Sequence, residues 1–206
     1  MGARETLGLL AILAVPLGDA LAQGADQPDE AKFSYTRAAD QPILELSYEG
    51  GMIADRDPTP YIRVYGDGRA VIHRPVYMKD AGEFELQLSP EELENLLATF
   101  AQPQLLTLEP GRLAAMAAEV QAEAGPVELP GDHGVTANVD VRLERVAPDT
   151  ASAPALLDVD RRISLPTAAV EAGARAPIEP LQDFAAGIRQ LEALAERPEL
   201  VKLPDN

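Results

Sequence analysis

Apolar and polar residues alternate in several short runs of this chain, which is the pattern of strands that bury one face. The runs that predict strands are residues 43–48, 83–88 and 139–144. Residues 156–165 are expected to hold one or two short strands, and residues 166–179 are expected to form a loop because of their composition.

The clearest local element is a hairpin between residues 61 and 73. The β-rich runs 61–65 and 69–73 flank a three-residue loop that contains two glycines, which is typical of hairpins. If Tyr65 pairs with Arg69, alternation assigns every other residue to a face. The face expected on the core carries Ile62, Val64, Ala70 and Ile72; the opposite face carries Tyr61, Arg63, Tyr65, Arg69, Val71 and His73.

A helix is predicted from Ser89 onward. Ser89 and Glu92 have the spacing of a capping box, in which each side chain bonds the backbone N–H of the other residue. Pro90 occupies the first helical position, where its missing N–H costs nothing, and Pro103 ends the helix. The apolar stripe of this helix consists of Leu93, Leu96, Leu97 and Phe100.

Two further helices are predicted, an alanine-rich one over residues 111–123 and one that starts at Pro180 and ends before Pro198. Gly187 is expected to weaken the last helix by up to about 1 kcal/mol. The apolar side of that helix consists of Leu181, Phe184, Ile188, Leu191 and Leu194. Runs of strands followed by helices predict an α+β fold: a mainly antiparallel sheet with two or three amphipathic helices packed on one face.

The first 22 residues have the organisation of a signal peptide. Arg4 precedes an apolar run over residues 7–15, which is too short to span a bilayer, and residues 20–22 form a small-x-small cleavage site. The division predicted for the whole chain is a cleaved signal peptide (1–22), a flexible N-terminal segment (23–41), a single α+β domain (42–200, with a possible linker at 147–155) and a tail (201–206).

Charge and composition narrow the possible partners. The chain has 34 acidic and 17 basic residues and a net charge of −17, so its surface repels phosphate backbones and anionic lipids, and neither nucleic acid nor a membrane is expected as a partner of the mature form. Without cysteine, thiol catalysis and cysteine-ligated metals are excluded. Alanine and arginine are abundant and lysine is rare, a composition typical of GC-rich bacteria. With the signal peptide, it predicts a bacterial protein that is periplasmic or secreted.

One stretch combines Pro60, Val64-Tyr65 and Asp67-Gly68-Arg69 with Leu88-Ser89, Glu92-Leu93 and Leu96-Leu97. On these positions, residues 60–97 resemble a hairpin–helix module of exported bacterial proteins of unknown function. The shared residues are mostly turn, cap and core residues. The resemblance therefore implies a fold and no activity.

No catalytic motif or cofactor motif is recognisable in the sequence. None of the serines lies in a G-x-S-x-G turn. A metal-dependent or carboxylate-based hydrolase is one alternative, and its first candidate residues are His73, His133 and Asp132. A divalent-cation binder is another, because carboxylates stand at alternate positions in Asp55-Arg56-Asp57 and in Asp158-Val159-Asp160.

The second face of the hairpin is the strongest candidate for binding. Tyrosine and arginine carry much of the binding energy at protein interfaces, and all five tyrosines lie before residue 80. The predicted binding residues are Tyr61, Arg63, Tyr65, Arg69 and His73. The alternative is that they are cross-strand pairs that stabilise the hairpin. The sequence thus favours a non-enzymatic binding or accessory protein without a cofactor, whose partner is another protein.

Overall fold

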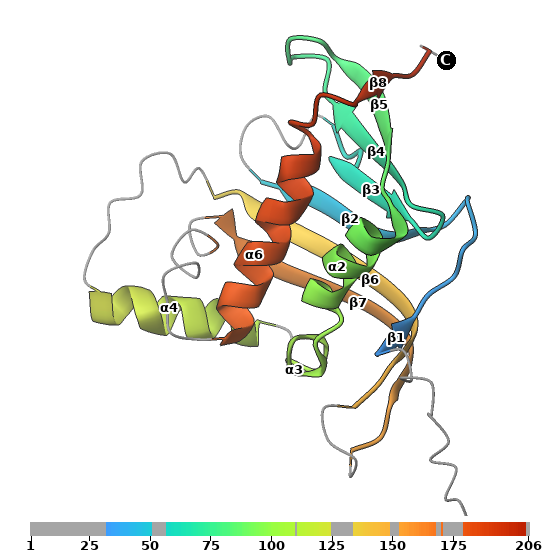
Figure 1. The fold of residues 1–206 in the computed structure, drawn as a ribbon. Helices are drawn as coiled ribbons and strands as arrows, with labels where there is room; N and C mark the ends of the chain where they lie inside the picture. The colour runs from blue at the N-terminus through green and yellow to red at the C-terminus, as the bar shows by residue number, and fades with distance from the viewer. Residues whose placement is uncertain are drawn as a thin grey trace, which may run out of the picture. The chain divides into compact units, whose positions relative to one another are not determined.

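The strands form one antiparallel sheet, and the helices lie on one of its faces (Figure 1). The computed structural model describes residues 32–50, 57–109, 111–124, 134–148, 153–167, 170 and 179–204. The predicted signal peptide lies outside these residues. The described strands are β1 (Phe33–Ser34), β2 (Pro42–Glu49), β3 (Ile62–Tyr65), β4 (Arg69–Arg74), β5 (Gly82–Gln87), β6 (Thr136–Val146), β7 (Leu156–Pro166) and β8 (Val201–Lys202). The described helices are α2 (Pro90–Phe100), α3 (Pro103–Leu106), α4 (Arg112–Ala124) and α6 (Glu179–Leu194).

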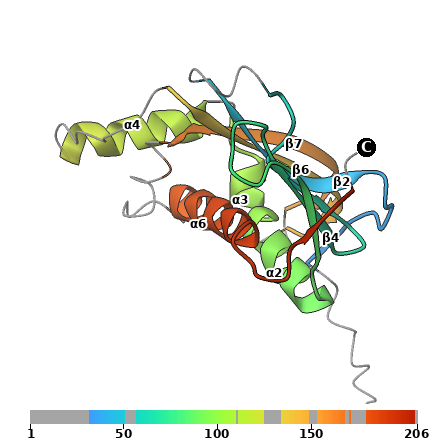
Figure 2. The ribbon, with the colours of Figure 1, turned by 90° about the horizontal axis from the view of Figure 1, so that it is seen from above.

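The described part of the chain contains an eight-stranded sheet, which confirms the predicted α+β class. Its strand order is β1-β6-β2-β3-β4-β5-β8, and β7 pairs with β6. Figures 1 and 2 show α2 and α6 side by side against this sheet. Both predicted apolar stripes are buried there, so the core lies between the two helices and the sheet.

The hairpin has the register predicted from alternation. Ile62 pairs with Ile72, Arg63 with Val71 and Val64 with Ala70. Ile62, Val64, Ala70 and Ile72 are all fully buried. The predicted core face of the hairpin is therefore confirmed.

Helix α2 begins as the sequence predicts. The Ser89 hydroxyl oxygen accepts from the Glu92 N–H at 3.2 Å, and a Glu92 carboxylate oxygen accepts from the Ser89 N–H at 2.8 Å. Both halves of the capping box are thus present, and they give two orphan backbone donors a partner.

Residues 156–165 differ from the expectation of one or two short strands. They lie in a single strand, β7, which pairs with β6 from Thr136↔Pro166 to Val146↔Leu156. The possible linker at 147–155 therefore connects two paired strands and does not separate two lobes. Pro, Ser and Asp are common both in linkers between domains and in connections between paired strands. Composition alone therefore does not distinguish the two.

The predicted flexible segment (23–41) and the predicted tail (201–206) each contribute a short strand to the sheet. Phe33 and Ser34, within the segment expected to be flexible, pair with Val146 and Arg145 of β6. Val201 and Lys202, expected to belong to a tail, pair with β5 at Glu85 and Phe84. Two-residue strands are too short for alternation to reveal, and pairing with a longer strand determines them.

Candidate functional site

Four of the five predicted binding residues lie on the outer face of the hairpin. Arg63 and Tyr65 of β3, and Arg69 and His73 of β4, alternate with the four fully buried core residues of the same strands. The fifth, Tyr61, precedes β3, and its ring lies beside Tyr48 of β2. The structure therefore separates Tyr61 from the arginines with which it was grouped.

Tyr65 and Arg69 lie at the turn end of the hairpin. The segment that precedes β2, which includes Thr36 and Ala39, packs against this end. The Arg69 guanidinium stacks 3.8 Å from the centre of the Tyr65 ring, and its Nη2 donates to the Ala39 carbonyl at 2.5 Å. A Cβ added at Gly66 would lie 1.8 Å from the Thr36 carbonyl oxygen, so only glycine allows this approach. Tyr65 is consequently buried, and this end of the predicted face is covered.

The middle of the face is formed by cross-strand ion pairs. Arg63 hydrogen-bonds Glu83 of β5, and Arg69 Nη1 lies 3.8 Å from an oxygen of Glu85. Arg63 reaches diagonally across β4 to Glu83, because Val71 stands between Arg63 and Glu85 in the register, whereas Arg69 of β4 pairs with Gln87 and meets Glu85 diagonally on the neighbouring strand. This is the arrangement that the cross-strand alternative describes. A role for these arginines at an interface stays a prediction.

At the other end of the hairpin, the His73 imidazole lies between two carboxylates. Nδ1 is 2.9 Å from Glu83 Oε1, and Nε2 is 2.8 Å from Asp57 Oδ2. Glu83 stands directly opposite His73 in the β4–β5 register, whereas Asp57 comes from the segment before β3. Ionised carboxylates only accept hydrogen bonds, so His73 donates from both nitrogens when its ring carries a positive charge. We call Asp57, Arg63, His73 and Glu83 the His73 cluster.

The His73 cluster places two carboxylates beside one imidazole and one guanidinium. The hydrogen bond with His73, followed by hydrogen bonding with Thr59, lowers the pKa of Asp57 below its ordinary value. The Thr59 backbone N–H donates to Asp57 Oδ1 at 3.1 Å. Because both ring nitrogens are hydrogen-bonded to carboxylates, neither faces a substrate or a metal ion in this arrangement. The cluster thus ties the segment around Asp57 to the sheet.

A cavity of about 230 Å³ opens beside the His73 cluster. We call it the tyrosine pocket, and its walls include Tyr48, Tyr61, Tyr77, Met78, Asp57 and His73. The rings of Tyr48 and Tyr61 are 6.0 Å apart between centroids and tilted by 53° to one another. The pocket therefore combines aromatic walls with one carboxylate and one imidazole.

Helix α6 holds the inner wall of the tyrosine pocket. The Tyr48 hydroxyl donates to Glu192 Oε1 at 2.5 Å. Burial, followed by this hydrogen bond, raises the pKa of Tyr48, and burial, followed by the charges of Glu196 and Glu192, raises the pKa of Tyr61. Both phenols are therefore neutral at physiological pH, and they lie near the carboxylates of Glu192, in the last turn of α6, and of Glu196, just beyond the end of that helix.

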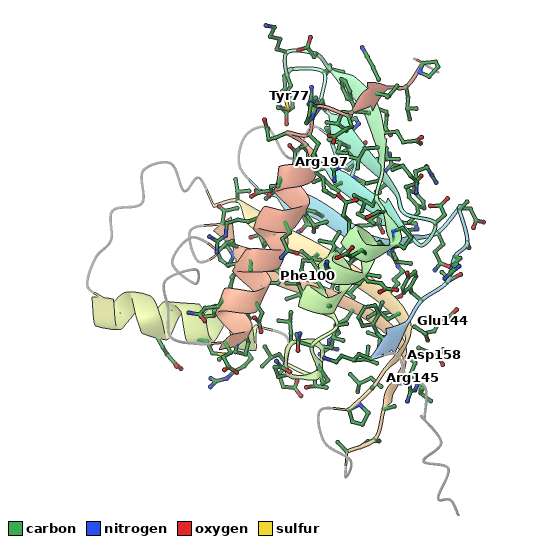
Figure 3. All side chains as sticks on the ribbon, in the orientation of Figure 1. Tyr77, Phe100, Glu144, Arg145, Asp158 and Arg197 are labelled. Carbon is green, nitrogen blue, oxygen red and sulfur yellow. The ribbon has the colours of Figure 1, made fainter. Side chains whose placement is uncertain are left out.

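The outer rim of the tyrosine pocket is an exposed apolar turn between β4 and β5. Val76 is 89%, Tyr77 52% and Met78 43% exposed. Figure 3 shows Tyr77 at the end of the sheet toward which the C-terminal part of α6 points. We call Val76, Tyr77 and Met78 the apolar lip. Adjacent exposed apolar side chains beside a pocket are typical of interaction sites.

A second hollow, of about 720 Å³, lies at the turn end of the hairpin. Tyr35, Asp67, Gln87 and Ser89 are among its lining residues. Two of these residues already use a polar group in a hydrogen bond within the fold. Asp67 accepts from the Arg69 N–H, and Ser89 caps α2. This hollow is therefore a weaker candidate than the tyrosine pocket.

Sequence reasoning missed the partners that complete the site. Tyr48 was assigned only to a strand, and Glu83 and Glu192 had no assigned role. Asp57 was noticed only as one half of a carboxylate pair with Asp55, which lies outside the described residues. The gathering of all tyrosines before residue 80 was the one signal that pointed to the tyrosine pocket.

The alternatives based on metal ions involve residues that are only partly described. His133 and Asp132 lie outside the described ranges. Asp160 of β7 is 3.7 Å from Arg142 Nε, which provides it with a cation from within the protein. Over the ranges that the structure covers, no group of three His, Asp or Glu side chains is placed to hold a metal ion.

Searches for similar proteins do not add an identification. No family model matches the chain, and neither a curated protein nor a solved structure is found to be similar to it. None of the helices in the described ranges is long and apolar enough to cross a membrane. The geometry of the tyrosine pocket is therefore the basis for proposing a function.

Proposed function

We propose that this is an exported, non-enzymatic binding or accessory protein, and that its recognition site is the tyrosine pocket with the apolar lip. The observation that carries the proposal is the exposure of three adjacent apolar residues, Val76, Tyr77 and Met78, of which Tyr77 and Met78 line a pocket walled by tyrosines. In a chain with a net charge of −17, such a local apolar surface is best explained by a partner that covers it.

Another protein is the partner that this surface fits best. Tyrosine and methionine provide large, adaptable contact area at interfaces, and the apolar lip extends that area beyond the small pocket. The proposed location, a bacterial periplasm or the exterior, rests on the signal peptide predicted over residues 1–22.

The hydrolase alternative receives less support from His73. A catalytic histidine needs one ring nitrogen directed at a nucleophile, a water or a substrate. In this protein Asp57 and Glu83 face the two nitrogens at 2.8 and 2.9 Å. The hydrolase alternative would therefore depend on a rearrangement of the His73 cluster.

A capture experiment with matched variants tests the proposal. The full chain, its Tyr77→Ser variant and its Leu157→Ser variant are immobilised and exposed to the extracytoplasmic fraction of the source cells. Leu157 is an exposed apolar residue of β7, so its replacement controls for a loss of surface hydrophobicity. Bound proteins are quantified by mass spectrometry.

We expect one protein to be retained by the unchanged chain and by Leu157→Ser but lost from Tyr77→Ser. Both substitutions are at exposed positions, so thermal unfolding of both variants should match that of the unchanged chain. Equal retention by Tyr77→Ser, or no specific retention by any of the three proteins, contradicts the proposed function.

A further inference from the structure

We propose that the tyrosine pocket binds the ammonium group of a lysine side chain presented by the partner protein. This inference rests on the proposed function and adds the chemistry that the site recognises. Four features of the site support it: the aromatic walls, the surrounding charges, the size of the pocket and the apolar lip.

Three aromatic rings line the pocket. Tyr48 and Tyr61 form a packed pair, tilted by 53° with centroids 6.0 Å apart, and Tyr77 adds a third ring. A cation is attracted to the face of an aromatic ring by the ring's quadrupole. The hydrogen bond of Tyr48 to Glu192 holds one aromatic wall of the pocket in place before the ligand arrives, which lowers the entropic cost of binding.

The charges around the pocket favour a cation. Asp57 lines the pocket, and burial, followed by the charges of Glu196 and Glu192, raises the pKa of Tyr61. Both ring nitrogens of His73 are already matched, because they face Asp57 and Glu83. An anionic ligand would meet these carboxylates, and the net charge of −17 would repel it from a distance.

The charge of Arg74 also acts on Tyr61, but its guanidinium is directed elsewhere. Its guanidinium lies 4.3 Å from the centre of the Phe84 ring, and its Nη2 donates to the Ala195 carbonyl at 3.0 Å. Arg74 is thus used in attaching the end of α6 to the sheet. It leaves the tyrosine walls available for a cation supplied from outside.

The size of the pocket and its lip favour a side chain on a protein over a free small molecule. Small-molecule sites usually enclose about 300 to 1,000 Å³, whereas this cavity measures about 230 Å³. Lysine carries a compact charge on a flexible apolar stem, in contrast to the broad planar group of arginine. Around it, Val76, Tyr77 and Met78 can pack on the partner's surface and exclude water from the bound charge.

A titration followed by amide NMR spectra tests the inference on the full chain. The probe is a capped Gly-Lys-Gly peptide, and the matched control is the same peptide with norleucine, which has a neutral apolar side chain of similar shape. We expect the lysine peptide to shift the amide signals of Tyr61, His73 and Tyr77 and to bind at least about tenfold more tightly than the norleucine peptide. Tyr77→Ser should weaken lysine binding several-fold, whereas Leu157→Ser should leave it unchanged.

Several outcomes would overturn the lysine inference. Equal binding of the two peptides in the pocket would identify an apolar site, and the proposed function would stand without the charge. Tighter binding of tetramethylammonium than of the lysine peptide would assign the site to a free organic cation. Signal changes spread over the acidic surface, or no change at the pocket even at millimolar peptide, would exclude lysine, and the capture experiment would then decide the proposed function on its own.

Discussion

Gly187, in the middle of α6, lies directly against the ring of Phe100 at the end of α2. A Cβ added at Gly187 would come within 2.4 Å of Phe100 Cζ and within 2.7 Å of Cε1. Phe100 is fully buried and is labelled in Figure 3 between the two helices. The missing side chain of Gly187 thus makes room for the largest apolar group of α2.

The first prediction concerns this contact. Gly187→Ala adds helix propensity of about 1 kcal/mol but forces a methyl group against a buried ring, and overpacking typically costs about 1 to 3 kcal/mol. We expect a lower free energy of unfolding in urea. Phe100→Leu should relieve the clash, so Gly187→Ala should cost less in that background than in the unchanged chain. A Gly187→Ala variant more stable than the unchanged chain would contradict this account.

The second prediction follows from the lowered pKa of Asp57. A carboxyl whose pKa falls on folding stabilises the fold above its ordinary pKa, and this contribution is lost as the pH falls through the folded-state pKa. Asp57→Asn should therefore cost about 1 kcal/mol near neutral pH. The difference from the unchanged chain should shrink below about pH 4.

Chemical denaturation at a series of pH values measures this difference. Asp160→Asn is the control, because the Asp160 side chain is 77% exposed and its cation, Arg142, lies 3.7 Å away. We expect a much smaller difference for Asp160→Asn at every pH. A cost of Asp57→Asn that stays constant through the acid range would contradict the role of the His73 bond.

The third prediction concerns the start of α2. Ser89→Ala removes the oxygen that accepts from the Glu92 N–H, and loss of such a cap costs about 1 kcal/mol. Ser89→Asp keeps an acceptor and should retain most of the stability. Thermal unfolding of the two variants distinguishes these outcomes, and equal melting temperatures for them would show that the cap contributes nothing.

Glu92 gives the capping box its own pH dependence. The Ser89 backbone N–H, followed by Arg197, lowers the pKa of Glu92 to about 2. The stabilisation by ionised Glu92 is therefore complete above its ordinary pKa and is lost as the pH falls toward about 2. We expect the unfolding free energy of Glu92→Gln to approach that of the unchanged chain in this acid range, and a gap that persists there would argue against it.

The fourth prediction compares two ion pairs of different burial. Arg162 holds the largely buried carboxylate of Asp140 with hydrogen bonds of 2.9 and 2.8 Å, whereas Arg112 and Glu119 are 3.7 Å apart and exposed. Arg162→Met leaves a desolvated carboxylate with one cation fewer and should cost about 1 to 2 kcal/mol. Arg112→Met should change stability by less than about 0.5 kcal/mol. Equal effects in urea denaturation would show that the burial of Asp140 has no energetic consequence.

Local patterns in the sequence were sufficient for most of the elements. The β3–β4 hairpin register follows from alternation and the glycine-containing loop, and the start of α2 follows from Ser89, Pro90 and Glu92. These features depend on residues within a few positions of one another, whose steric and hydrogen-bonding preferences are the same in any fold. The elements that alternation missed, β1 and β8, exist only because β6 and β5 provide pairing partners.

The candidate site could be predicted only in part, because some of its residues find their partners on other strands and helices. Sequence reasoning placed Arg63 and His73 on one face of a hairpin, but it could not supply their carboxylate partner Glu83 on the neighbouring strand. The grouping of Tyr61 with the arginines depended on regular alternation beyond the end of β3. In the structure, Tyr61 instead packs beside Tyr48.

By itself, the sequence determined helices α2, α4 and α6, strands β2 to β6 and the division of the hairpin into a core face and an opposite face, because burial periodicity and capping are local properties. The tertiary structure alone decided that Tyr48 meets Glu192, 144 positions later in the chain, and that Gly187 is a packing requirement against Phe100. Contacts between residues so far apart depend on how the helices pack on the sheet, and no local preference encodes that arrangement. The tyrosine pocket is therefore a property of the assembled fold.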